Sequence, residues 1–259
     1  MNRIEFEDAL QAYESRFNSM EPELELTVRD PGLGVAVAAR TMLEETGRSP
    51  SSATIAVQGV GAMGAAVCRY ATEYGMTVRF IADPRIGGCW RIESEFDGPL
   101  AEAIVTMDFE AARTALEEGP HVCTELDDVL VQSVDVLFPC AVQDVITADN
   151  VDAIAASAVV EGADDACTME ARGLLEDRGV TVIPDFIANP GGAIAANVES
   201  DVTDEENART RARVTEAKEF TEQAVAGNVR RAMELADEAG VGITRAGLLI
   251  SYQRVFGEA

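Results

Sequence analysis

The sequence predicts an α/β fold, a doubly wound and mostly parallel sheet flanked by helices near the N-terminal and C-terminal ends of the chain. Two observations support this prediction. Short apolar runs alternate with helical segments between residues 53 and 184, and such alternation is typical of parallel sheets. The runs are also mostly apolar and do not alternate regularly with polar residues, as expected for strands that are buried on both faces.

The expected elements follow one another regularly along the chain. Strands are predicted at residues 53–57, 77–82, 134–139, 158–162 and 180–184, and helices at residues 4–17, 31–45, 65–74, 109–118, 147–156 and 168–178. A loop is expected around Gly87, Gly88 and Trp90. Beyond residue 203 the pattern predicts one helix with Phe220 on its apolar face, a second through Val229, and a third over residues 243–255.

The most specific signal lies at the start of this alternation. The apolar run ATIAVQ is followed by Gly59, Gly61 and Gly64 at G-x-G-x-x-G spacing, then by a helical segment and a second apolar run. Asp83 ends the second run, 19 residues after Gly64. A strand, a glycine loop, a helix, a second strand and an acid at this distance together predict a dinucleotide-binding unit of the Rossmann type.

Each glycine has a distinct expected role. Gly59 permits the tight turn, Gly61 lets the backbone approach a pyrophosphate, and Gly64 lets the helix pack closely on the strand. The start of the helix offers N–H groups and the positive end of its dipole to phosphates. The loop residues expected to contribute to this site are Gly59, Val60, Gly61, Ala62, Met63 and Gly64.

The end of the second strand, Asp83 and Pro84, should contact the adenosine ribose. Asp83 would accept hydrogen bonds from the ribose hydroxyls and would repel a 2′-phosphate, which favours NAD over NADP. Arg85 is close enough in sequence to meet such a phosphate, so NADP stays open. We expect the dinucleotide-binding domain to span residues 47–200, between a helical segment at 1–46 and another at 201–259 that packs on it.

The composition is strongly acidic. The 259 residues include 46 Asp and Glu against 20 Lys and Arg, a net charge of −26, and Lys218 is the only lysine. An acidic surface almost without lysine predicts a protein adapted to a salt-rich cytoplasm, because salt screens the self-repulsion. The same charge argues against nucleic acid or an anionic membrane as a partner.

Membrane and metal chemistry are not expected. No apolar run approaches the ~18 residues that a membrane-spanning helix needs, and the N-terminus lacks a signal-peptide pattern, so we expect a cytoplasmic protein. The five cysteines form no C-x-x-C pair, and His121 is the only histidine. Metal sites of the usual spacing therefore cannot be assembled.

An ordered series of motifs follows the glycine loop. Residues 135–141 read DVLFPCA, residues 145–147 VIT, residues 159–163 VVEGA and residues 184–192 PDFIANPGG. Together with the glycine loop, this series resembles the nucleotide-binding domain of the glutamate/leucine/phenylalanine/valine dehydrogenase family. The resemblance implies an oxidoreductase that deaminates an L-amino acid with NAD or NADP and that has a separate substrate domain.

The resemblance also extends the candidate site. It implies that Cys140 and Ala141 line the cofactor crevice and that Asp164 and Asn189 lie near the nicotinamide or its ribose. Carboxyl ends of strands are where doubly wound sheets bind ligands, which agrees with this placement. Two alternatives stay open: Cys140 is a core residue or a redox-sensitive thiol, and Asn189 binds the cofactor or caps the next helix.

The chain departs from the family's pattern in two respects that bear on activity. Only about fifty residues precede the first predicted strand, too few for a substrate domain of ordinary size. The reaction needs a lysine of lowered pKa, whereas Lys218 lies in an acidic helical tail.

We therefore expect a cofactor-binding subunit of an amino-acid dehydrogenase whose substrate domain comes from another chain, or a cofactor-binding half excised from a longer enzyme. The expected partner is a chain that carries the substrate domain or, in a homo-oligomer, other copies of this chain. The alternatives are a non-catalytic NAD-binding sensor or regulatory module, and a scaffold that kept the fold without the ligand.

Overall fold

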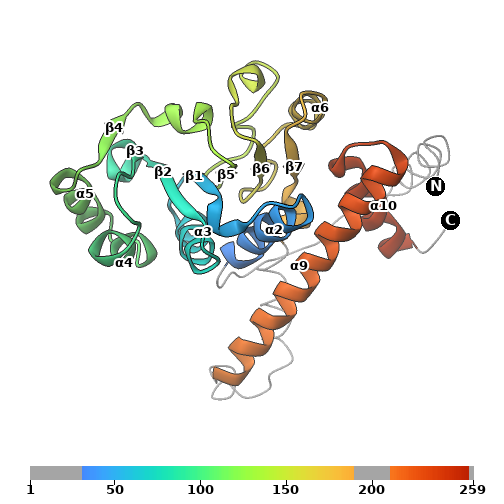
Figure 1. Ribbon diagram of the computed structural model, residues 1–259, viewed down its shortest axis with the longest axis horizontal. Coiled ribbons are helices and arrows are strands. Elements are labelled where there is room, and N and C mark those ends of the chain that lie inside the picture. Colours follow the sequence, from blue (N-terminus) through green and yellow to red (C-terminus); the bar gives the residue numbers. More distant parts are fainter. Residues whose placement is uncertain (1–30, 190–210, 257–259) are drawn as a thin grey trace.

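The computed structural model describes residues 31–189 and 211–256, which form a seven-stranded sheet covered by helices (Figure 1). The strand order is β4-β3-β2-β1-β5-β6-β7. The predicted helix at residues 4–17 lies outside the described residues. Strands β1, β2, β5, β6 and β7 run parallel, which confirms the predicted doubly wound, mostly parallel sheet.

The five parallel strands lie close to their predicted positions. They are β1 (Thr54–Gln58), β2 (Thr77–Asp83), β5 (Val136–Pro139), β6 (Ala158–Val160) and β7 (Thr181–Ile183). Strand β1 pairs with β2 on one side and with β5 on the other. The chain order therefore reverses between β1 and β5, and the loops that follow these two strands open at the same edge of the sheet, where doubly wound sheets bind ligands.

Four helices between residues 31 and 178 lie close to their predicted positions, whereas α4 (Gly98–Val105) and α7 (Asp185–Ala188) were not predicted. The four are α2 (Gly32–Glu45), α3 (Ala62–Glu73), α5 (Phe109–Glu118) and α6 (Met169–Asp177), and α9 (Arg211–Ala239) and α10 (Ile243–Phe256) follow towards the C-terminus. Helix α6 begins where Thr168 accepts a hydrogen bond from the Ala171 N–H, and Gly179 follows its end with a φ of +79°. Both are ordinary helix-end devices.

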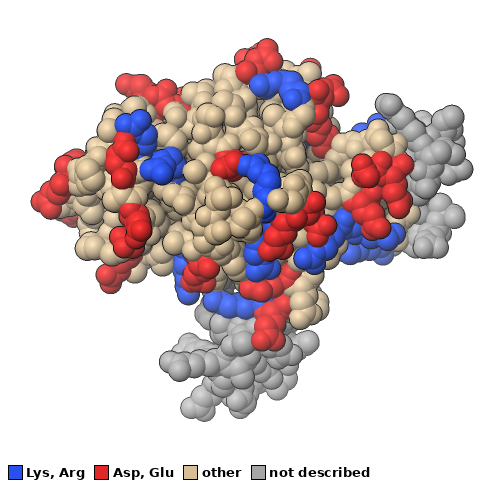
Figure 2. Space-filling model, in the orientation of Figure 1, with Lys and Arg blue, Asp and Glu red and all other residues tan. Residues whose placement is uncertain are grey.

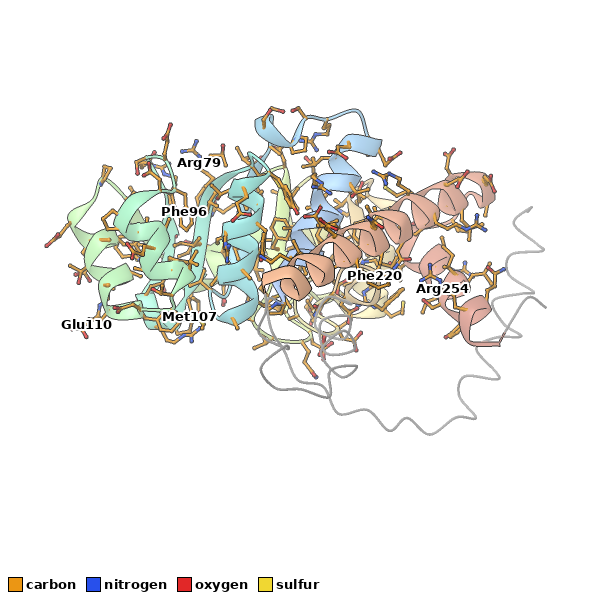
Figure 3. All side chains as sticks on the ribbon, turned by 90° about the horizontal axis from the view of Figure 1, so that it is seen from below. Arg79, Phe96, Met107, Glu110, Phe220 and Arg254 are labelled. Atoms are coloured by element: carbon orange, nitrogen blue, oxygen red, sulfur yellow. The ribbon has the colours of Figure 1, made fainter. Side chains whose placement is uncertain are left out.

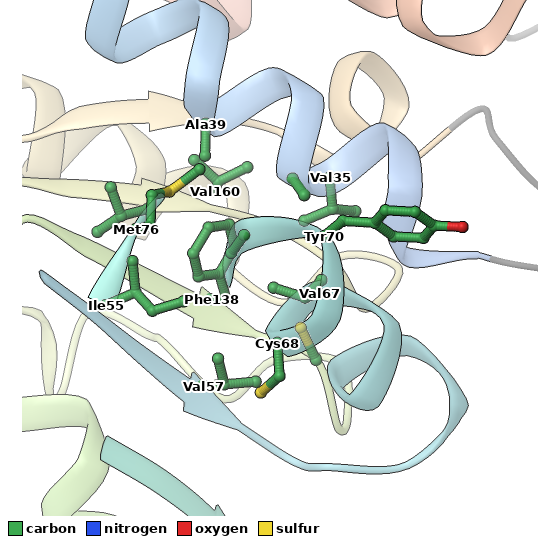
Figure 4. Close-up of a cluster of buried hydrophobic side chains, with 14 of the residues drawn as sticks. Val35, Ala39, Ile55, Val57, Val67, Cys68, Tyr70, Met76, Phe138 and Val160 are labelled. Carbon is green, nitrogen blue, oxygen red and sulfur yellow. The ribbon is translucent and has the colours of Figure 1, made fainter. Parts of the chain in front are cut away.

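The sheet is buried on both faces. Ile55 and Val57 of β1 face the cluster formed with α2 and α3, whereas Ala56 between them faces the opposite cluster with α6. Figure 4 shows Ile55, Val57 and Phe138 of the sheet meeting side chains of α2 and α3. The alternation of buried side chains between two cores explains why the strands are continuous apolar runs.

The C-terminal helix α9 packs against α2. Val225 and Val229 of α9 are buried in the same cluster as α2, and Arg230 Nε of α9 lies 2.9 Å from Glu45 Oε1 of α2. Figure 1 shows α9 running beside α2 and extending beyond the sheet. Figure 2 shows acidic side chains at both ends of the visible face, with basic side chains among them along α9.

Three local predictions were wrong. Residues 88–91, expected in a loop, form strand β3 (Gly88–Arg91), which pairs antiparallel with β2 and with β4 (Val122–Thr124). The turn at residues 84–87 closes a hairpin, and Gly87 supplies its left-handed residue with a φ of +92°. Trp90 is consequently buried in the core and donates its indole N–H to the Ile86 carbonyl.

The predicted helix at residues 147–156 is also absent, and only a short 3₁₀ turn forms there, at Val151–Ala153. Asn150 explains the difference. Its side-chain oxygen accepts the Thr147 N–H and its amide donates to the Val145 carbonyl, both at 2.8 Å. Such local side-chain bonds compete with the helical pattern.

The third wrong prediction concerns the C-terminal segment. Helix α9 is continuous through Gly227, where two helices were expected. Phe220, labelled in Figure 3, was expected on the apolar face of the first of them but is 56% exposed.

Candidate functional site

The glycine loop connects β1 to α3 at the carboxyl edge of the sheet. Gly59 has a φ of +84°, and its N–H donates to the Ala82 carbonyl at 2.7 Å. A Cβ on Gly59 would lie 2.6 Å from the Ala141 Cβ, and one on Gly64 would lie 1.8 Å from the Gly59 carbonyl oxygen. The first position needs a left-handed residue and the second needs the smallest possible one, so both glycines are required by the fold.

Gly61 differs from the other two glycines. It is the residue that caps α3, with an ordinary φ of −72°, and a Cβ placed there would contact only the tip of Arg85, at 3.3 Å. The fold therefore does not require glycine at this position. Gly61 also has no side chain to accept hydrogen bonds from the first turn of α3, which leaves that turn suited to an anion.

Asp83 is held at the end of β2 by a complete set of donors. Its Oδ2 accepts the Val60 N–H at 3.1 Å and Arg85 Nη2 at 2.7 Å, and its Oδ1 accepts the Arg85 N–H at 2.9 Å and Arg85 Nε at 2.8 Å. Its side chain is 4% exposed. Burial alone would raise the pKa of Asp83, but the bonds from Arg85 and Val60 hold that pKa below its ordinary value.

The loop after β5 forms the other side of the crevice. Ala141 is exposed, and its N–H bonds to Gln58 Oε1 at 3.2 Å, which ties this loop to β1. Cys140 is buried, and burial raises the pKa of its thiol well above the ordinary value. These facts favour the core interpretation of Cys140 over a reactive thiol.

The loop after β6 meets both of these loops. A Cβ on Gly162 would lie 2.6 Å from Cys140 Sγ and 3.1 Å from Met63 Cγ. Asn189 Nδ2 donates to the Gly162 carbonyl at 3.0 Å. The structure therefore brings together Met63, Cys140 and Asn189 around Gly162, while Asp164 is exposed two residues further on.

A buried ionic network that sequence reasoning missed supports this last loop. Arg172 of α6 is 2% exposed and binds Glu161 through Nε at 2.7 Å and through Nη2 at 2.8 Å. Its Nη2 also lies 3.0 Å from Asp185 and 3.3 Å from Asp165. Burial lowers the pKa of Arg172, but Glu161 and then Asp185 outweigh burial and hold that pKa above its ordinary value. The one available sequence signal was Glu161, an acidic residue within the otherwise apolar run predicted as a strand at residues 158–162.

Metal clusters and membrane-spanning helices are both absent from the described part of the chain. Residues 31–189 and 211–256 contain no group of three or more His, Cys, Asp or Glu side chains that could hold a metal ion. In the same residues no helix is both long and apolar enough to cross a membrane. Lys218 Nζ lies 5.0 Å from the centre of the Tyr70 ring of α3, a cation–π distance.

Comparisons with known proteins find relatives of this chain in both sequence and fold. The family model described as Glutamate/Leucine/Phenylalanine/Valine dehydrogenase matches residues 26–258. The NAD-specific glutamate dehydrogenase A of Halobacterium salinarum is 36% identical over 169 residues, which are 65% of this chain and 37% of that protein. The NADP(+)-dependent glutamate dehydrogenase of Pyrobaculum calidifontis is 34% identical over 190 residues, 71% of this chain and 44% of that protein.

A solved structure shows the same similarity. The hetero-hexameric glutamate dehydrogenase of Thermus thermophilus, in its leucine-bound form, aligns with a TM-score of 0.70 and 25% identity, covering 88% of this chain and 52% of that one. This chain therefore spans less than half the length of the two curated relatives and about half of the solved chain.

Proposed function

The chain belongs to the glutamate/leucine/phenylalanine/valine dehydrogenase family of oxidoreductases, and from that premise we propose that residues 54–189 bind a nicotinamide dinucleotide at the carboxyl edge of the sheet. The glycine loop is the observation that supports this most strongly. Gly59 and Gly64 are accounted for by the fold, whereas Gly61 is not. A glycine that the fold does not need, at the start of α3, fits a pyrophosphate that approaches the backbone closely.

The proposed cofactor site has two ends. Gly61, Ala62 and Met63 at the start of α3 would hold the pyrophosphate, and the Asp83–Arg85 pair would meet the adenosine ribose. Cys140, Ala141 and Gly162 would line the opposite end, with Asn189 fixing the Gly162 carbonyl. The nicotinamide, when bound, supplies hydride transfer. The protein residues bind and orient it, and we place Asp164 at the exposed rim of this end.

We further propose that this chain is the cofactor-binding half of an amino-acid dehydrogenase that deaminates an L-amino acid. The relatives are named glutamate dehydrogenases, and the chain corresponds to less than half of their length. The substrate domain would be supplied either by a partner chain or by a further part of the same protein, outside these 259 residues. The division at residues 46 and 200 is part of this proposal, as is a salt-rich cytoplasmic setting.

A non-catalytic sensor or regulatory module is the second candidate function, and one observation favours it. Lys218, the only lysine of the chain, packs on the Tyr70 ring, between α9 and α3. A lysine that activates water must have a lowered pKa and reach the substrate. A chain whose lysine is engaged in packing would bind the cofactor without turnover.

Calorimetric titration of the full chain with NAD and NADP tests the proposed site. Gly61→Val should weaken binding at least about tenfold, because a side chain there blocks the phosphate, while the loss of glycine at the helix cap should lower stability by only about 1 kcal/mol. Gly173→Val, at an open position in α6, is the matched control and should bind normally. Equal binding by Gly61→Val and wild type would contradict the site. Amino-acid-dependent formation of NADH or NADPH then separates the enzyme, which turns over, from the sensor, which does not.

A further inference from the structure

The Asp83–Arg85 pair bears on which cofactor this site prefers. Asp83 was expected to offer its carboxylate to the ribose hydroxyls. In the structure its two oxygens already accept four hydrogen bonds, three from Arg85 and one from the Val60 N–H. A carboxylate has about four lone-pair positions. A ribose 2′-hydroxyl would therefore find no open acceptor on Asp83 unless Arg85 moved away.

Arg85 is fixed in place by contacts on two sides. Its Nε and Nη2 form a bidentate fork on Asp83, and its guanidinium carbon lies 3.8 Å from the centre of the Phe109 ring of α5. Bidentate pairing and stacking on an aromatic ring both restrict the guanidinium to one plane. The side chain is nevertheless 50% exposed, and its Nη1 group makes no hydrogen bond to any described residue.

The position of this guanidinium is next to the glycine loop. Arg85 Nη2 lies 3.3 Å from the point that a Cβ on Gly61 would occupy. Gly61 is the loop residue at which a pyrophosphate would approach. The guanidinium therefore lies on the side of the loop where the second strand ends, which is the ribose side of a dinucleotide site.

The charges of Asp83 and Arg85 also favour a 2′-phosphate over a 2′-hydroxyl. The buried Asp83 carboxylate is neutralised by Arg85, so an incoming phosphate group meets a half-exposed guanidinium edge. A 2′-phosphate offers several acceptor oxygens and a negative charge to that edge, whereas a 2′-hydroxyl offers one acceptor and no charge.

We propose, on the premise of the proposed dinucleotide site, that Arg85 binds the 2′-phosphate and that this site prefers NADP over NAD. Asp83 is then a positioning residue, which holds Arg85 and does not itself contact the ribose. The sequence favoured NAD because Asp83 would repel a 2′-phosphate. That reasoning assumed an open carboxylate, and the structure shows an occupied one.

Calorimetric titration of the full chain with NADP and with NAD, in parallel at one fixed salt concentration, tests this proposal. Wild type should bind NADP at least about tenfold more tightly than NAD, as charge-assisted hydrogen bonds would give. Arg85→Ala should lose that difference, with NADP binding weakened about tenfold or more and NAD binding unchanged or tighter. Arg91→Ala is the matched control: Arg91 is equally exposed, at 51%, pairs with Glu93, and should keep the preference.

A second measurement does not depend on any variant. The ³¹P NMR signal of the 2′-phosphate of NADP should shift on binding to wild type, and the phosphate should lose its second proton at lower pH than in free NADP, because a guanidinium stabilises the dianion. Tighter binding of NAD than of NADP by wild type, or an Arg85→Ala variant that keeps its NADP preference, overturns the inference and leaves the dinucleotide site intact. Failure of wild type to bind either cofactor instead overturns the proposed function, and this inference with it.

Discussion

At the scale of single residues, the three glycines of the loop have separable physical roles. Gly64 is required by packing, because a Cβ there would lie 1.8 Å from a backbone oxygen that cannot move without displacing β1. The backbone conformation at position 61 suits residues other than glycine, whereas position 59 has a positive φ that favours glycine. Gly61 is therefore the one glycine of the motif that the fold does not explain, and a bound ligand is the remaining explanation for it.

Gly64→Ala should destabilise the protein by about 3 kcal/mol, since overpacking against backbone forces the helix away from the strand. The measurement is urea unfolding followed by circular dichroism. Gly227→Ala is the control: Gly227 lies in α9, no atom lies within 4 Å of the point that a Cβ there would occupy, and alanine should add about 0.5–1 kcal/mol. Equal effects of the two substitutions would contradict the close helix–strand packing.

Asp83 gives a pH-dependence that can be predicted in sign. Its pKa in the folded protein is lower than in the unfolded chain, so the unfolded chain binds the proton more readily. The stabilisation from Asp83 is therefore present above its ordinary pKa, about 3.9, and is lost as pH falls through the folded-state pKa. In the Asp83→Asn variant the free energy of unfolding should fall less steeply below about pH 4 than in wild type.

At the scale of elements, the Arg172 network joins α6 to the ends of β6 and β7. Glu161 follows β6, Asp185 begins α7 after β7, and both bind the same guanidinium. The Cys167 N–H also donates to Glu161 Oε2, at 3.2 Å. The buried ion pair between Arg172 and Glu161 thus fixes the loop at residues 162–167. The Gly162 carbonyl is held where Asn189 donates a hydrogen bond to it.

Arg172→Met should cost about 3–5 kcal/mol, because it leaves the Glu161 carboxylate buried without its partner. The double variant Arg172→Met/Glu161→Gln should recover part of that loss, since the unpaired charge is removed while the amide still accepts the Cys167 N–H. Urea unfolding of both variants measures the difference. A double variant no more stable than Arg172→Met would show that the lost guanidinium contacts, and not an unpaired charge, dominate the cost.

At the scale of the whole molecule, the net charge of −26 should make stability depend on salt. The Debye length falls from about 10 Å at 0.1 M to about 3 Å at 1 M, so repulsion between surface carboxylates is screened. The urea midpoint should therefore rise over this range of KCl. Sucrose at matched osmolarity is the control and should raise the midpoint less. A midpoint that does not respond to KCl would contradict the proposed adaptation to salt.

The sequence predicted the parallel strands, helix α5 at its observed bounds and the glycine loop, because each depends on local patterns of apolar residues and turn residues. It could not predict features that depend on side chains meeting in space. Asp83 and Arg85 are only two residues apart in sequence. Whether Arg85 occupies the Asp83 carboxylate nevertheless depends on the rotamers of both side chains and on Phe109 of α5. Arg172 is 13 or fewer positions from each carboxylate that it binds, but only the folded sheet brings these residues into one cluster around its buried guanidinium.

The most direct test of the central claim is an amide NMR titration of the full chain with NADP and NAD. The claim is that the loop after β1 and the loop after β5 bind one dinucleotide between them. The largest shifts are expected at the backbone amides of Gly61, Ala62, Met63 and Ala141. Shifts centred elsewhere, or no shifts at cofactor concentrations that saturate ordinary dehydrogenases, would contradict it.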